Sequence, residues 1–228
     1  MNITSSQNLR IKQVIKLRDD KKQRELNKLM LVEGWNEIDL ALKAGFLPQT
    51  ILIAPDLTNR KYDNVSTEII TLSQALFEKV SYRQNPDGWL AVFHTPDKSL
   101  QDIKLSPKPL LIVAESIEKP GNLGAILRTA DAVGVDALFV CDPRTDIYNP
   151  NVVRASRGTL FTVPTIMLSN MDAYSIESSW HSMPRYHLRR RCAARSACVL
   201  RYDHFPTGSR HFPSLRMVSC HALHGQMV

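Results

Sequence analysis

The 228-residue chain lacks a long apolar segment. No stretch of about 18 consecutive apolar residues occurs, so no transmembrane helix is predicted. The N-terminus, MNITSSQNLRIKQ, has no apolar core of the kind found in secretory signals, so no signal peptide is predicted. Cysteine is scarce, and its four residues are irregularly spaced, which favours a reduced cytoplasmic protein over a disulfide framework.

Two common ligand-binding signatures are also missing. The candidate loop after the strand LLIVAESI does not have the G-x-G-x-x-G spacing of dinucleotide-binding proteins, which disfavours an unrelated nucleotide-binding α/β domain. Near the C-terminus, the spacing of the Cys and His residues fits no usual structural zinc site: Cys192, Cys198, Cys220, His221 and His224. We therefore predict no metal site.

The net positive charge of the chain comes from the C-terminal part of the sequence. The formal net charge is +7, yet residues 1–177 contain 21 Lys and Arg against 21 Asp and Glu. Residues 178–228 contain eight arginines, no lysine and one acid, Asp203, which accounts for the whole excess. The global charge therefore says nothing about nucleic-acid binding by the rest of the chain.

Residues 177–228 also lose the pattern of a folded α/β chain. They contain no isoleucine and no lysine, hold six of the seven histidines, and show no sustained helical or strand period. This composition is typical neither of a linker nor of an ordinary disordered segment. We predict an aberrant, disordered tail, and our hypothesis is out-of-frame translation beyond residue 176. A periodic α/β sequence should then reappear in another frame of the gene.

Residues 1–95 alternate helical and strand signals, which predicts a small layered α/β domain. After a helical opening segment, helices are predicted at NEIDLALKAG and QALFEKV and strands at QTILIAP, TEIITLS and GWLAVFH. The opening segment is basic, because residues 10–28 hold eight Lys and Arg against three acids. It is either a solvated helix face or a phosphate-contacting surface, for which Arg10, Lys12 and Lys16 are the candidates.

A proline-rich segment without periodicity, residues 96–107, is predicted to be a linker. It leads into a second α/β unit, residues 108–176. There the apolar strand LLIVAESI, the loop EKPGNLG, the helix AILRTADAVG and the strand DALFVCD form a βαβ unit. A continuous apolar strand of this kind is typical of a parallel sheet covered on both faces.

The start of the βαβ helix carries the polar residues of interest. Helix N-termini bind anions, and Asn122 and Arg128 lie where their side chains can reach such a ligand. The alternative is structural: Arg128 pairs with Asp131 or Glu118, and Asn122 caps the helix. The three-position pattern N-x-G-x-x-x-R does not by itself decide between these interpretations.

Residues 110–166 resemble the SpoU/TrmH family of RNA ribose 2′-O-methyltransferases, within the SPOUT superfamily. The matching pieces are LLIVAESI, EKPGNLGAILRTADAVGVDALFV and NPNVVRASRGTLFTVP, in the family's order. The N-terminal part is similar to the family's ribosomal-protein-like substrate-binding domain through ITSSQNLRIKQVIKLRD, LVEG and NPDGWLAVF. The resemblance implies an α/β fold: this substrate-binding domain, then an incomplete SPOUT α/β-knot domain with a parallel sheet.

The resemblance also implies a reaction, in which S-adenosylmethionine methylates a ribose 2′-hydroxyl of rRNA or tRNA. It makes Asn122 and Arg128 catalytic residues. A guanidinium has a pKa above about 12, so holding RNA phosphate and stabilising the developing alkoxide is the easier role for Arg128. Arg154 and Ser156 match the family's RaSxG stretch and become RNA-binding candidates. The alternative there is helix capping by Ser156 and packing by Gly158.

The family's two C-terminal motifs have no match beyond residue 176. The resemblance assigns to them the knot, most of the cofactor pocket and much of the homodimer surface, so the cofactor-binding residues stay unknown. Their loss also predicts open strand edges and poor solubility. Two functions remain: a methyltransferase acting in rRNA processing, or a non-catalytic RNA-binding remnant. Both have RNA, rather than DNA or a membrane, as the partner, in the cytoplasm.

Overall fold

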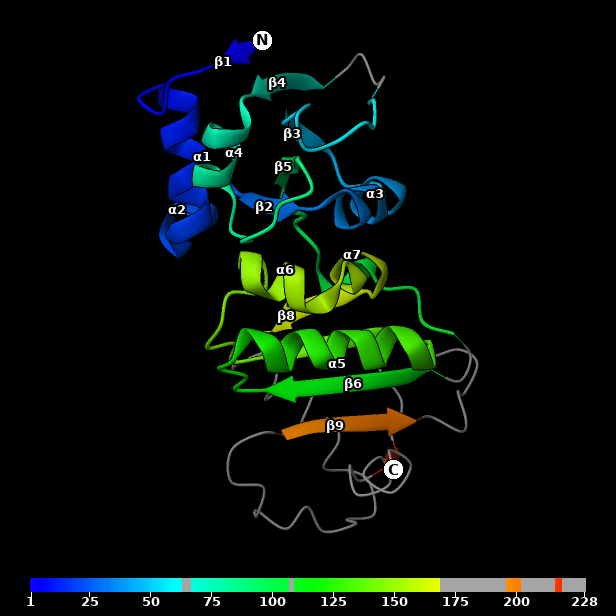
Figure 1. The fold of residues 1–228 in the computed structure, drawn as a ribbon. Coiled ribbons are helices and arrows are strands. Elements are labelled where there is room, and N and C mark those ends of the chain that lie inside the picture. Colours follow the sequence, from blue (N-terminus) through cyan, green and yellow to red (C-terminus); the bar gives the residue numbers. More distant parts are fainter. Residues whose placement is uncertain (63–66, 107–108, 169–195, 202–215, 219–228) are drawn as a thin grey trace. The chain divides into compact units, whose positions relative to one another are not determined.

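The computed structural model describes residues 1–62, 67–106, 109–168, 196–201 and 216–218, and its chain forms two compact units (Figure 1). The first unit comprises Met1–Asp97 and Asp146–Thr162, and the second comprises Lys98–Thr145 and Val163–Val228. Each unit contains a sheet and helices, so the mixed α/β class predicted from the sequence is confirmed. The sequence placed residues 146–162 with the second domain, whereas here they pack with the first.

The first unit is built on a five-stranded sheet in the order β1-β4-β3-β5-β2. β1 and β3 run parallel to β4, whereas β5 is antiparallel to both β3 and β2. β5 has a strand on each side, which explains why its residues are buried up to Phe93. The strands are β1 (Asn2–Ile3), β2 (Leu29–Glu33), β3 (Pro48–Ile53), β4 (Glu68–Leu72) and β5 (Trp89–His94).

Helices pack against this sheet through alternate strand residues. α1 (Leu9–Asp19) and α4 (Gln74–Val80) share one apolar cluster with the strands. That cluster includes Ile11, Val14, Leu17, Leu52, Ile70, Leu76, Phe77, Val80 and Leu90. α3 (Trp35–Lys43) contacts β2 and β5 and contributes nothing to that cluster. The opening segment is two helices, because Asp20 ends α1 and its carboxylate caps α2 (Lys21–Asn27).

The edge strand β2 is covered by a segment that lies far away in the sequence. α6 (Pro150–Ser156) packs against β2, and α7 (Thr159–Thr162) packs against α3. An uncovered edge strand offers unpaired backbone groups to other chains, and a helix laid over it prevents that pairing. The segment Asp146–Thr162 therefore completes the first unit.

The second unit contains a sheet in the order β10-β9-β6-β7-β8. Its parallel part is β6 (Leu110–Glu115), β7 (Ala137–Cys141) and β8 (Thr165–Leu168). α5 (Pro120–Val133) joins β6 to β7 and ends at Gly134, whose φ of 65° lies in the left-handed region that glycine tolerates. Among the described residues, no helix is long and apolar enough to cross a membrane.

Within the segment predicted to be a linker, residues 96–107, the part from Lys98 to Ser106 belongs to the second unit. It contains a short 3-10 helix, η1 (Leu100–Asp102), and its Leu100, Ile103 and Leu105 pack against the core formed by β6, β7 and β8. Asp136 fastens the end of the segment, because its carboxylate accepts backbone N–H bonds from Ser106 and Leu110, both at 2.8 Å. The prolines of this segment led to the prediction of a linker, because the spacing of its few apolar residues forms only a weak pattern.

Two strands lie within the predicted tail, residues 177–228. β9 (Ser196–Arg201) pairs antiparallel with β6, and β10 (Arg216–Val218) pairs antiparallel with β9. The expectation of a disordered tail is therefore corrected for these residues, and of the strand edges predicted to be open, the edge of β6 beside β9 is paired. The short apolar run ACVL within β9 is typical of a strand, although it is too brief to show a period. The rest of the predicted tail lies outside the described residues.

Candidate RNA-contacting site

The helix α5 carries both predicted catalytic residues of the second unit. Its N-cap is Lys119, which makes no side-chain capping bond, and Pro120 occupies the first turn. Asn122 lies inside that turn, half-buried, and its backbone N–H donates to the Lys119 carbonyl at 3.0 Å. Asn122 is therefore not the capping residue that the structural alternative proposed. Arg128 is exposed, one turn after the buried Gly124.

The loops that follow β6 and β7 are linked by polar contacts. Ser116 and Asp142 both adopt a positive φ, 51° and 43°, and the Ser116 hydroxyl donates to the Asp142 carboxylate at 3.3 Å. Arg144 pairs with Glu118 at 2.8 Å. The carboxyl ends of parallel strands are the usual ligand-binding edge of an α/β sheet. Glu118, one partner considered for Arg128, is thus engaged by Arg144.

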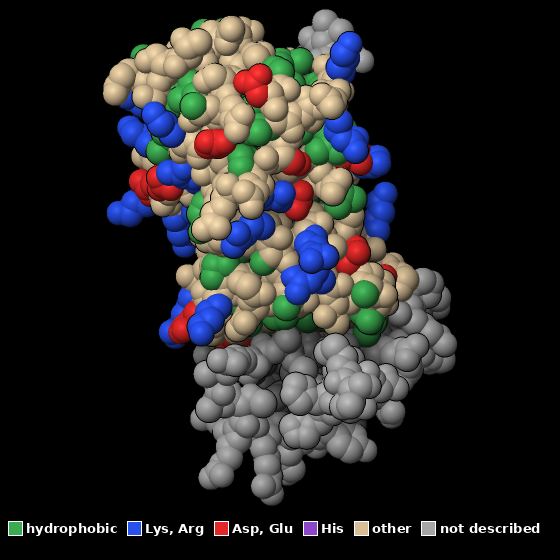
Figure 2. All heavy atoms as spheres, in the orientation of Figure 1, with side chains coloured by type: hydrophobic (Ala, Val, Ile, Leu, Met, Phe, Trp, Pro, Cys, Tyr) green, Lys and Arg blue, Asp and Glu red, His purple; other side chains and the backbone are tan. Residues whose placement is uncertain are grey.

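The basic residues predicted on α1 differ in their surroundings. Arg10 forms an exposed ion pair with Glu68. Lys12 and Lys16 are exposed on the same helix, whose apolar residues face the core. Figure 2 shows one face of the molecule, where Lys and Arg side chains are interspersed with Asp and Glu over the described part. Lys12 and Lys16 are therefore better placed than Arg10 to contact phosphate, and RNA contact by all three stays a prediction.

Arg18 has a structural role that the basic pattern did not reveal. Its Nη1 donates to the carbonyls of Lys79, Val80 and Ser81 at 2.9, 3.2 and 3.2 Å, which satisfies the C-terminus of α4. Its Nε and Nη2 pair with the Asp19 carboxylate at 2.8 and 3.0 Å. The hydrogen bond from Arg18 is the main reason why the pKa of Asp19 is lowered.

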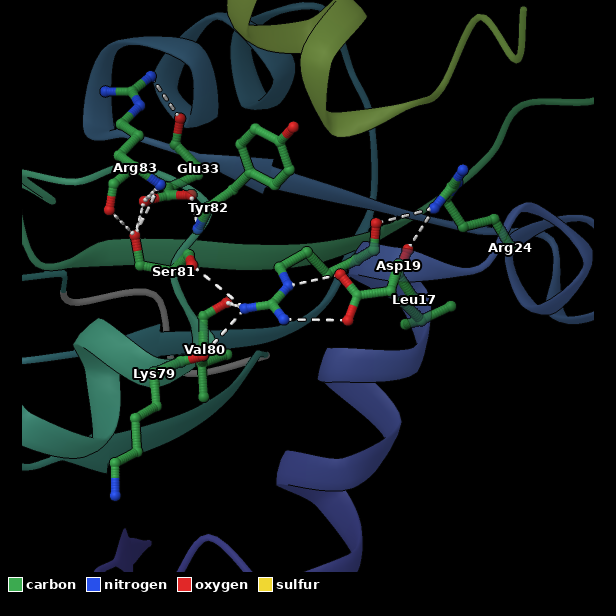
Figure 3. Close-up of polar contacts among 10 residues, drawn as sticks. Leu17, Asp19, Arg24, Glu33, Lys79, Val80, Ser81, Tyr82 and Arg83 are labelled. Atoms are coloured by element: carbon green, nitrogen blue, oxygen red, sulfur yellow. Dashed lines mark hydrogen bonds and ion pairs between the residues drawn. The ribbon is translucent and has the colours of Figure 1, made fainter.

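Arg24 is buried and joins two distant parts of the first unit. Its Nε lies 2.7 Å from the Asp146 carboxylate, and the two side chains are only 4% and 9% exposed. Its Nη1 donates to the carbonyls of Leu17 and Arg18 at 2.6 and 3.2 Å, at the end of α1 (Figure 3). Arg24 is therefore unavailable to RNA, and the basic excess of residues 10–28 overstates the charge offered to a ligand.

The RaSxG stretch falls on α6, in the first unit. α6 begins after Asn149, whose side chain accepts a backbone hydrogen bond in the first turn. Arg154 is exposed, and its guanidinium lies over the Tyr82 ring, 5.5 Å from the centroid. Ser156 has no exposed surface and donates to the Val153 carbonyl at 2.8 Å. The prediction that Ser156 contacts RNA is thus corrected, because in this conformation its hydroxyl is enclosed and satisfied.

The glycine of the RaSxG stretch, Gly158, is required by the local backbone conformation and by close packing. Its φ is 85°, and a Cβ atom there would lie 2.6 Å from Cδ1 of Leu40 on α3. Phe161 packs edge-on against Phe46, with ring centroids 5.1 Å apart. The packing alternative considered for Gly158 is therefore what the structure shows.

The stretch LVEG forms part of a polar network beside α6 (Figure 3). The Glu33 carboxylate accepts from the Ser81 hydroxyl at 2.5 Å and from the Tyr82 backbone N–H at 2.8 Å. Arg83 donates through Nη2 to the Glu33 carbonyl and to the Glu37 carboxylate, both at 2.8 Å. The sequence marked LVEG only by resemblance, since no local pattern predicts bonds between residues about fifty positions apart.

A small pocket lies between this network and α6, lined by Leu31, Glu33, Tyr82, Arg83, Pro150, Val153 and Arg154. The first unit thus brings Arg154 together with Tyr82 and Arg83, and it also holds Arg10, Lys12 and Lys16 on α1. Asn122 and Arg128 belong to the second unit. No group of three or more potential metal ligands occurs among the described residues.

Solved proteins with this architecture are RNA methyltransferases. An RNA 2′-O-ribose methyltransferase aligns at 34% identity with a TM-score of 0.67, covering 81% of this chain and 71% of that chain. The SpoU methyltransferase AviRb from Streptomyces viridochromogenes, solved with AdoMet, aligns at 26% identity and a TM-score of 0.68, covering 77% of this chain and 68% of that one. The fold is therefore that of a SPOUT RNA methyltransferase with a substrate-binding domain.

Two sequence families match the chain in succession. Residues 8–91 match the MRM3-like substrate binding domain, and residues 109–183 match the SpoU rRNA Methylase family. The chain belongs to the SpoU rRNA methylase family, which confirms the resemblance predicted from its motifs.

Curated relatives carry the same kind of name. The 23S rRNA (guanosine(2553)-2'-O)-methyltransferase RlmP of Bacillus subtilis is 31% identical over 172 residues, which are 75% of this chain and 66% of RlmP. Human mitochondrial rRNA methyltransferase 3 is 29% identical over 174 residues, 72% of this chain and 38% of the relative. The chain therefore spans somewhat less than two thirds of the first and about two fifths of the second.

Proposed function

We propose that the chain is an RNA methyltransferase that transfers a methyl group from S-adenosylmethionine to a ribose 2′-hydroxyl of rRNA. The observation that carries this proposal is the alignment of both units with a solved RNA 2′-O-ribose methyltransferase at 34% identity. Relatives named for 23S rRNA favour rRNA over tRNA, since both RlmP and a Streptomyces viridochromogenes enzyme bear that substrate in their names.

In the proposed reaction, four exposed or half-buried residues contact the RNA substrate. Arg128 holds the phosphate beside the target ribose and stabilises negative charge as the 2′-oxygen develops it. Asn122, half-buried in the first turn of α5, orients the ribose through its amide, which both donates and accepts. Lys12 and Lys16 contact phosphates elsewhere on the RNA, which contributes affinity without sequence preference.

S-adenosylmethionine supplies an electrophilic methyl group on a sulfonium. The described residues at the carboxyl ends of β6 and β7 do not by themselves fit this group. Their polar side chains bond to one another, Ser116 to Asp142 and Glu118 to Arg144. The family motifs that would form the cofactor pocket have no match after residue 176. The proposed roles are therefore confined to RNA binding and to the ribose hydroxyl.

The experiment combines the purified chain, an rRNA transcript and S-adenosylmethionine carrying a labelled methyl group. Label should enter the RNA as a 2′-O-methyl nucleotide, and Arg128→Ala should remove at least about 99% of that activity, in line with the loss of an oxyanion donor. Arg144→Ala is the matched control, because Arg144 is also an exposed arginine of the second unit. Equal activity of Arg128→Ala and the control would refute the role of Arg128.

A second candidate is a non-catalytic RNA-binding remnant, favoured by the absence of the two C-terminal motifs. Saturable binding of labelled S-adenosylmethionine to the chain supports the enzyme. RNA binding without cofactor binding supports the remnant, and the loss of both contradicts both candidates.

Two further properties belong to the proposal. The family resemblance implies a homodimer, whereas the missing C-terminal motifs, which would carry much of the dimer surface, argue against one; sedimentation equilibrium distinguishes a monomer from a dimer. A cytoplasmic location follows from the scarce cysteines, and imaging of a fluorescent fusion tests it.

A further inference from the structure

Tyr82 is an exposed aromatic residue beside a basic side chain of the first unit. It retains 39% of its surface, whereas Trp89, Phe77 and Phe93 of the same unit are fully buried. The Arg154 guanidinium lies over its ring at 5.5 Å from the centroid. A planar cation stacked on a solvent-facing ring presents a flat, positively charged surface.

The backbone below this ring is held in place by buried groups. The Tyr82 N–H donates to the Glu33 carboxylate at 2.8 Å, and the neighbouring Ser81 hydroxyl donates to the same carboxylate. Arg83 fastens the other side, because its Nη2 bonds to both the Glu33 carbonyl and the Glu37 carboxylate. Figure 3 shows that these bonds engage the backbone around Tyr82 and leave its ring outside the network. A ligand that contacts the ring therefore loses little binding free energy to the ordering of Tyr82.

Arg154 is fixed to the same unit. α6 packs against β2, and Pro150 and Val153 of α6 line the pocket together with Leu31 and Tyr82. The ring and the guanidinium thus come from elements that form one compact unit, although they lie 72 positions apart in the sequence.

We propose that Tyr82 and Arg154 form a stacking site for an unpaired base of the RNA. This inference rests on the proposed function, because it names the form of RNA that the first unit recognises. Aromatic rings and arginine planes stack on the faces of unpaired bases, and every base has such a face. The charge of Arg154 serves the phosphate attached to that base. In a duplex the base faces are stacked on one another, so this surface selects single-stranded loops or ends.

The test measures the affinity of the full chain for a short single-stranded RNA containing 2-aminopurine and for the duplex of the same sequence. Stacking on Tyr82 should quench 2-aminopurine fluorescence. Tyr82→Leu keeps an apolar side chain but removes the ring, so it should bind the single strand roughly 10-fold more weakly and lose the quenching. Tyr82→Phe keeps the ring and should bind like the wild type.

Arg154→Lys keeps the charge and removes the planar group, so it should weaken single-strand binding by roughly 3-fold and leave duplex binding unchanged. Lys43→Ala is the matched charge control, since Lys43 is an exposed residue of α3 that pairs with Asp39. If Tyr82→Leu loses its fold, it should bind the duplex more weakly as well. The stacking site is then judged from Tyr82→Phe, which should keep both the affinity for the single strand and the quenching.

The outcomes separate this inference from the proposed function. If the wild type binds neither RNA, both are overturned. If the wild type binds the single strand, and Tyr82→Leu binds it with equal affinity and quenching, the stacking site is overturned while the proposed function stands.

Discussion

Removing the charge of Asp146 should detach α6 from the first unit. Asp146→Asn keeps the shape of the side chain but leaves the Arg24 guanidinium buried without its counter-charge. Breaking a buried ion pair by changing one partner costs about 3–5 kcal/mol. Arg24 keeps two backbone carbonyl acceptors, so we expect the lower end, a loss of about 3 kcal/mol in the free energy of unfolding of the first unit.

The measurement is a urea titration followed by tryptophan fluorescence in a Trp180→Phe background. Two of the three tryptophans then remain, Trp35 and Trp89, and both belong to the first unit. Hydrogen exchange supplies the local readout, because the Val153 amide of α6 donates to the Asn149 carbonyl and should lose protection first.

The paired replacement Arg24→Met with Asp146→Leu is the control. Exchanging a buried ion pair for apolar side chains of similar volume is often neutral or stabilising, so most of the lost stability should return. The reasoning is refuted if Asp146→Asn changes the free energy of unfolding by less than about 0.5 kcal/mol, the size expected for an exposed pair, and the α6 amides keep their protection.

Three further predictions concern single residues. Gly158→Ala should lower the stability of the first unit by about 1–3 kcal/mol, through positive-φ strain and the clash with Leu40, and an unchanged melting temperature would contradict this. Cys141 should resist iodoacetamide at pH 8, because burial raises the pKa of its thiol to about 11; rapid labelling of its peptide, detected by mass spectrometry, would show otherwise. Burial alone would raise the pKa of Asp136, but the N–H bonds that it accepts lower it overall, so its contribution is present above the unfolded-state pKa and is lost as the pH falls through the folded-state value. Asp136→Asn should therefore destabilise the second unit at pH 7 and differ less and less from the wild type in acid unfolding curves as the pH falls below about 4; a constant difference would argue against this linkage.

The regular elements could be predicted because their signals are local. QALFEKV is helical as predicted, and the strands predicted at QTILIAP, TEIITLS and GWLAVFH are present as β3, β4 and β5. Apolar runs bounded by Gly, Pro or a capping residue are sufficient for such elements. The βαβ unit at β6, α5 and β7 follows the same logic, with Gly134 ending the helix.

The contacts that shape the candidate site could not be predicted, because their partners are distant in the sequence. Arg24 and Asp146 are 122 positions apart, and each alone looks like an ordinary surface charge. The count of eight basic residues in residues 10–28 included Arg18 and Arg24, yet both satisfy helix C-termini in the structure. Ser156 was misassigned for a related reason, since a serine in a short helix gives no indication of its burial.

The path of the backbone has a consequence for the modularity of this protein. The chain leaves the first unit after Asp97, returns to it at Asp146 and leaves it again after Thr162. The two family matches, residues 8–91 and 109–183, invite a single cut between them. Such a cut would remove α6 from β2 and α7 from α3, expose the edge of β2 and leave Arg24 buried without its partner. The first unit consists of two separate stretches of sequence, so recombination between relatives can exchange it intact only if both stretches are exchanged together. Its evolution is therefore tied to that of the intervening sequence of the second unit.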